Sequence, residues 1–120
     1  MKYTDIFVDC PPAEIQRMIQ QVFHQNMFDV LWHSPSAGKA YRGSKGKNLA
    51  LGAVSQYYEI DFQIFALPER TMAVRLIKSN TGWWGGILGA HLVESRFTEV
   101  VNMLSNYFYS LGVYKGRNPP

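Results

Sequence analysis

The chain has 120 residues, of which 47% are hydrophobic and 14% aromatic, and its formal net charge is +3. This length suits one domain with its own core, and the apolar runs fall far short of the ~20 residues that a membrane-spanning helix requires. The single Cys10 excludes an intramolecular disulfide. With no leader-like pattern at the start, we expect a cytoplasmic protein.

Hydrophobic periodicity predicts the first elements in chain order. Alternation of apolar and polar residues predicts a strand at 3–10, and Pro11 and Pro12 end it in a way that suits the first turn of a helix. An apolar stripe then predicts an amphipathic helix at 13–25. Alternation returns at 28–33, 39–44, 57–65 and 71–79, which are predicted strands, whereas the pattern at 49–54, with Gly52, is ambiguous.

A helical period dominates the last third of the chain. An apolar stripe that includes Phe97, Val100 and Leu104 predicts a long helix at 86–111. The segment 114–120 has no periodicity, so we expect a loose tail after a single domain at 1–113. The order is β-α-β4-α, an α+β class with a mostly antiparallel sheet and both helices on one face.

The joint before the last helix is TGWWGGILGA, residues 81–90. A phosphate-binding loop is disfavoured because no basic residue lies within it, and the tryptophans would crowd a phosphate. Gly85, Gly86 and Gly89 lie on one side of the helix start, which indicates close packing. We expect one of Trp83 and Trp84 to anchor the core and the other to cover a pocket mouth or an interface.

This order, with the long helix after the GWWGGILG joint, resembles the TATA-binding-protein-like topology and, more broadly, the START-like or helix-grip domains. The resemblance covers the whole chain and rests on element order and the joint. It implies a curved sheet around the C-terminal helix, with a hydrophobic small molecule or lipid between them. For a TATA-binding-like repeat it implies DNA binding by the concave sheet, which this chain would have to dimerise to achieve.

Few residues suggest catalysis or metal binding. His24, His33 and His91 have no partner at metal-ligand spacing, and Glu94, three residues after His91, completes at best half a site. Cys10 shares a face with Ile6 and Val8, so a buried, inert thiol is the favoured interpretation. We therefore expect no metal and no cofactor.

Charged residues allow two further interpretations. Asp5, Asp9, Glu59 and Asp61 lie opposite the apolar positions of their strands, either as an acid–base pair or, as we favour, as cross-strand ion-pair partners of residues such as Arg75. The segment 37–48 could contact phosphate or nucleic acid, although a hairpin kept soluble by its charges is the preferred account. Its basic residues are Lys39, Arg42, Lys45 and Lys47.

The leading functional hypothesis is a non-catalytic module that binds an apolar small molecule or lipid-like group between the sheet and the C-terminal helix. An enzyme is disfavoured because no nucleophile has an identifiable base. The alternatives are a homo-oligomeric assembly protein, which would use the uncovered sheet face or the tryptophan pair, and nucleic-acid binding through the basic hairpin. The side chains expected to bind the ligand are Trp32, Tyr58, Phe62, Trp83, Trp84 and His91.

Overall fold

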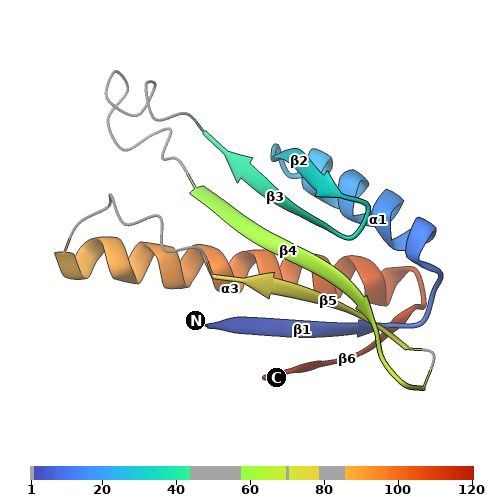
Figure 1. The fold of residues 1–120 in the computed structure, drawn as a ribbon. Helices are drawn as coiled ribbons and strands as arrows, with labels where there is room; N and C mark the ends of the chain where they lie inside the picture. The colour runs from blue at the N-terminus through green and yellow to red at the C-terminus, as the bar shows by residue number, and fades with distance from the viewer. Residues whose placement is uncertain (1, 44–57, 70, 79–85) are drawn as a thin grey trace.

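The computed structural model describes residues 2–43, 58–69, 71–78 and 86–120, with only the backbone described at 86–93. These residues form a six-stranded antiparallel sheet with two helices, which confirms the predicted α+β class (Figure 1). The strand order across the sheet is β2-β3-β4-β5-β1-β6. The elements are β1 (Tyr3–Val8), α1 (Pro12–Gln25), β2 (Asp29–Ser34), β3 (Ala37–Arg42), β4 (Tyr58–Ala66), β5 (Met72–Ile77), α3 (Gly86–Ser110) and β6 (Tyr114–Asn118).

The predicted strands at 3–10, 28–33, 39–44, 57–65 and 71–79 correspond to β1 to β5, and the two predicted helices correspond to α1 and α3. The ambiguous segment 49–54 and the tryptophan pair of the joint lie outside the described residues. Within the described ranges, no helix combines the length and apolar character needed to cross a bilayer.

Both ends of α1 are set by local sequence. The carbonyl of Pro11 accepts the first helical hydrogen bonds, from the amides of Glu14 and Ile15 at 3.0 and 3.1 Å. At the other end, the amide of Phe28 donates to the carbonyl of Phe23 at 2.9 Å, and Met27 has a φ of 68°. This is the Schellman arrangement, in which a left-handed residue follows the helix and apolar residues meet across the turn. It directs the chain from α1 into β2.

The core lies between one face of the sheet and the two helices. The inward side chains of the strands share a single buried cluster with residues of α1 and of α3, and Figure 1 shows both helices on the same side of the sheet. The largest fully buried side chains are Phe23, Phe62, Phe108, Ile6, Ile15, Ile19, Ile60, Leu76, Leu104, Val8, Val22 and Val74. The alternation seen in the sequence thus separates a packed face from an open one.

The C-terminal segment differs from the prediction. The tail expected to be loose contains β6, which pairs antiparallel with β1 and places Arg117 opposite Ile6. The amide of Asp9 also donates to the carbonyl of Val113 at 2.9 Å. Backbone hydrogen bonds hold this strand at the sheet edge, and Gly116 within it has a φ of 120°. Because apolar side chains are not what holds the strand, its sequence shows no alternation of apolar and polar residues.

Candidate functional site

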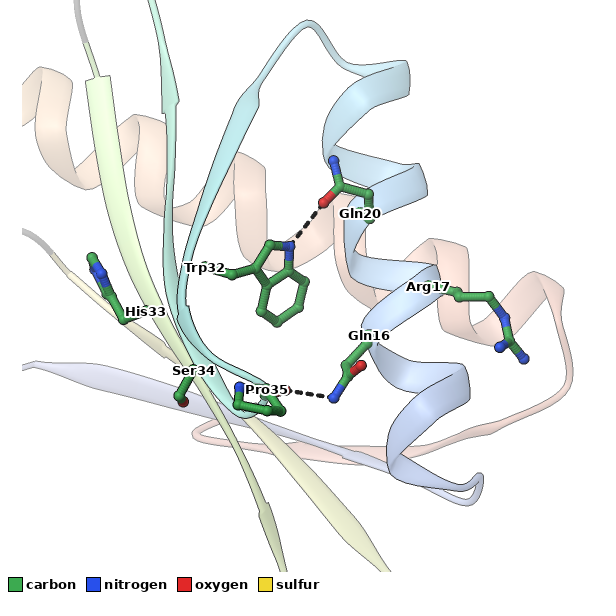
Figure 2. Close-up of a pocket in the computed structure, with 7 residues that line it drawn as sticks. All are labelled: Gln16, Arg17, Gln20, Trp32, His33, Ser34 and Pro35. Carbon is green, nitrogen blue, oxygen red and sulfur yellow. Dashed lines mark hydrogen bonds between the residues drawn. The ribbon is translucent and has the colours of Figure 1, made fainter.

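A groove of about 410 Å³ opens between the outer flank of α1 and β2, which we call the Trp32 groove. The helix contributes polar side chains, and the strand and the following turn contribute the opposite wall (Figure 2). The volume lies within the usual range for small-molecule sites. The lining residues are Gln16, Arg17, Gln20, Trp32, His33, Ser34 and Pro35.

Trp32 is the largest side chain of the groove and is held from two sides. Its ring meets Phe62 edge to face, with centroids 5.0 Å apart and planes at 80°. Its Nε1 donates a hydrogen bond to Oε1 of Gln20 at 2.8 Å. Because the indole N–H is already satisfied, what Trp32 offers a ligand is an apolar ring in a fixed orientation.

The rim of the groove supplies polar groups. Nε2 of Gln16 donates to the carbonyl of Pro35 at 2.6 Å, which ties the first half of α1 to the β2–β3 turn. Arg17 forms an exposed ion pair with Glu14 one turn earlier on the helix. In Figure 2 the imidazole of His33 points away from α1, on the opposite side of β2 from Trp32. The groove therefore combines an aromatic wall with amide groups at its edge, whereas the guanidinium of Arg17 extends away from Trp32 (Figure 2).

The residues expected to bind a ligand do not form one site in the described structure. Trp32 and Phe62 are in contact, but Phe62 is 1% exposed and supports Trp32 from within the core. Tyr58 is also buried, near the start of β4. Trp83 and Trp84 lie outside the described residues, and for His91 only the helical backbone is described.

Tyr58 lies at a polar junction where three elements meet. It is the cross-strand neighbour of Arg42, whose guanidinium lies 4.4 Å from the centroid of the Phe28 ring and 3.6 Å from a carboxylate oxygen of Glu99 on α3. The Tyr58 hydroxyl is buried and has no hydrogen-bond partner in the described structure. Burial, with a smaller contribution from Glu99, raises the pKa of this phenol well above its ordinary value.

The two basic residues of the segment 37–48 that lie within the described ranges make internal contacts. Nζ of Lys39 lies 3.5 Å from a carboxylate oxygen of Glu59 on β4, and Arg42 bridges to α3 as described above. Lys45 and Lys47 lie outside the described residues. Lys39 and Arg42 therefore have a structural role in joining β3 to its neighbours.

The carboxylate of Asp5 pairs across strands, as favoured from the sequence. On the open face of the sheet, Arg75 donates to it twice, from Nε at 2.8 Å and from Nη2 at 3.0 Å. The same guanidinium lies 3.9 Å from the ring centroid of Tyr3 and 5.0 Å from that of Phe65. Two-point pairing of this kind fixes the orientation of the two side chains relative to each other, and it occupies both oxygens of the Asp5 carboxylate.

The other reactive groups are also engaged or buried. Lys78 and Lys2 both donate to the Glu94 carboxylate, and these hydrogen bonds lower the pKa of Glu94. Burial raises the pKa of the half-buried Cys10 thiol, which keeps it protonated. No group of three or more potential metal ligands occurs among the residues whose side chains the structure describes.

Sequence reasoning missed the helix side of the groove. Gln16, Arg17 and Gln20 belong to the polar stripe of α1, which the amphipathic pattern assigns simply to solvent. Their spacing places them on one flank of the helix, and this is a usable signal only once α1 is known to lie beside β2. Comparison of the sequence with protein-family models and with curated proteins gives no match.

Proposed function

We propose that this protein is a non-catalytic binding module that holds a small, ring-containing molecule in the Trp32 groove. The observation that carries the proposal is the fixed indole of Trp32, which is held by Phe62 and Gln20 beside a groove of about 410 Å³. Stacking on the indole would supply affinity, and the amide groups of the rim would orient a polar substituent.

The topology-level resemblance to helix-grip and TATA-binding-protein-like domains supports a binding module as the general class. In our proposal the ligand lies against α1, whereas the resemblance implies a site between the sheet and the C-terminal helix. Tyr58 is buried and does not belong to the residues that line the groove, so it takes no part in the proposed site.

The test is ligand-observed NMR with a library of aromatic and heteroaromatic fragments. We expect hits that lose about tenfold or more in affinity in Trp32→Ala, since stacking on an aromatic ring contributes roughly 1–3 kcal/mol. Trp32→Phe should retain part of the binding. Tyr109→Ala removes an aromatic side chain that is 74% exposed on α3 and serves as the matched control. Hits that bind Trp32→Ala as well as they bind the parent protein would refute the proposal.

A further inference from the structure

The two edges of the sheet are protected to different degrees. Within the described residues, β6 forms one edge, and its short sequence contains Lys115 and Gly116 and runs into Pro119 and Pro120. Lysine, proline and an irregular backbone are the features that prevent an edge strand from pairing with another chain. The opposite edge, β2, has the sequence DVLWHS, without Lys, Gly or Pro, and its register irregularity lies near the end of the strand, between Trp32 and Ser34.

The side chains of β2 also favour pairing. Leu31 points to the open face of the sheet and is 52% exposed, whereas its neighbours Val30 and Trp32 are half-buried on the other face. Asp29 and His33 flank it on the same face and are exposed. In an antiparallel edge strand, alternate residues direct both their N–H and C=O groups outward, so β2 presents a row of backbone groups beside an apolar side chain.

Antiparallel pairing of β2 with a second copy of itself has one register that satisfies these side chains. If Leu31 lies opposite Leu31 of the partner subunit, then Asp29 lies opposite the partner's His33, and Val30 lies opposite the partner's Trp32. Directly opposed residues share a face, so the acidic group meets an imidazole on the open face and the apolar pair lies on the helix side. A shift of two residues either way places Asp29 opposite Leu31 or Pro35, and the complementarity is lost.

We propose that two copies of this chain join through β2 about a two-fold axis at Leu31, forming one continuous sheet. The axis is perpendicular to the sheet, so both copies keep α1 on the same side. The interface buries Leu31 against its own symmetry mate and contains two Asp29–His33 contacts. This inference does not depend on the proposed ligand, although Trp32, which lines the groove, also lies opposite Val30 of the partner subunit.

The first test is the mass in solution, measured by light scattering after gel filtration and by sedimentation. We expect twice the 13.7 kDa of the chain. Leu31→Lys places two ammonium groups face to face at the axis and should give a monomer with an unchanged circular dichroism spectrum. Leu111→Lys is the matched control, because Leu111 is 48% exposed in the turn after α3. A monomeric parent protein, or a dimer that persists in Leu31→Lys, would overturn the proposal.

The second test determines the register. His33→Asp places two carboxylates opposite each other at two symmetry-related points, and Asp29→His does the same with two imidazoles. We expect His33→Asp to weaken the dimer about tenfold, because like charges directly opposite are unfavourable. The double exchange Asp29→His with His33→Asp should restore most of the affinity. If the double variant is as weak as His33→Asp alone, these residues are not opposed and the register is wrong.

Discussion

Gly38 of β3 lies directly opposite Phe62 of β4, and the absence of a side chain at Gly38 leaves the space that the Phe62 ring occupies. A Cβ atom at Gly38 would lie 2.8 Å from Cζ of Phe62 and 2.6 Å from the carbonyl oxygen of Leu31. Both distances are shorter than van der Waals contact. Phe62 in turn stacks on Phe23 of α1 and supports Trp32, so this one glycine determines how the aromatic core meets the groove.

Gly38→Ala should therefore destabilise the protein. The added methyl group must displace a buried ring and a backbone carbonyl, and such overpacking costs about 1–3 kcal/mol. Urea denaturation of the purified variant measures the change in the free energy of unfolding. Combining Gly38→Ala with Phe62→Leu, which shortens the opposing ring, should give a smaller loss than the sum of the two single changes. Additive losses would contradict the contact.

Met27 offers a substitution expected to stabilise the fold. It has a φ of 68° at the end of α1 and is 80% exposed, so it bears the left-handed conformation without packing in return. Met27→Gly should raise the free energy of unfolding by about 0.5–1 kcal/mol, since glycine favours this position after a helix. Gln21→Gly, at an exposed position inside α1, is the control and should lower it by about 1 kcal/mol. A destabilised Met27→Gly would contradict the interpretation of the helix end.

The sequence allowed the element types to be predicted wherever burial imposes a period. The alternation along Tyr58–Ala66 and the stripe along α1 record which side chains face the core, so β4 and α1 were recognised. The strand β6 was missed because its placement depends on backbone pairing with β1 and on contacts of Arg117 with α3. Periodicity carries no information about such edge contacts.

The candidate site was predictable only in part, for the same reason. Aromatic character alone predicts Trp32 as a ligand-binding residue, but Phe62 and Tyr58 share that character and lie in the core. What distinguishes Trp32 is its place on the edge strand beside the polar flank of α1, where Gln20 meets it. Adjacency of that kind arises from the tertiary fold, since the two residues belong to different elements.

Tyr58 predicts a specific dependence of stability on pH. Its hydroxyl is buried without a partner in the described structure, and burial raises the pKa of the phenol in the folded protein. The phenol ionises near pH 10 in the unfolded chain and at higher pH in the folded protein. Ionisation of Tyr58 therefore leaves the free energy of unfolding unchanged below about pH 10 and lowers it as the pH rises further. Urea denaturation at a series of pH values up to 11 should show a steeper loss in the parent protein than in Tyr58→Phe.

At neutral pH, Tyr58→Phe should be neutral or stabilising by up to about 1 kcal/mol, because an unpaired buried hydroxyl opposes folding. Tyr109→Phe, at a position that is 74% exposed, is the control and should leave both the stability and its pH dependence unchanged. A clear destabilisation by Tyr58→Phe at neutral pH would show that the hydroxyl has a partner.

Arg117 ties the last strand to the last helix. Its Nη1 donates to Oδ1 of Asn102 at 2.9 Å and to Oγ of Ser105 at 3.2 Å, and Ser105 is 6% exposed. Arg117→Ala removes both bonds and leaves the Ser105 oxygen without this donor, which should cost about 1–2 kcal/mol in the free energy of unfolding. Lys115→Ala, at an exposed position on the same strand, should change the free energy of unfolding by no more than about 0.5 kcal/mol.

Amide hydrogen exchange should also become faster along β6 and at its partners in β1, but only in Arg117→Ala, because the contact with the helix holds β6 against the sheet. Equal effects of the two substitutions would mean that backbone pairing with β1 suffices to hold β6.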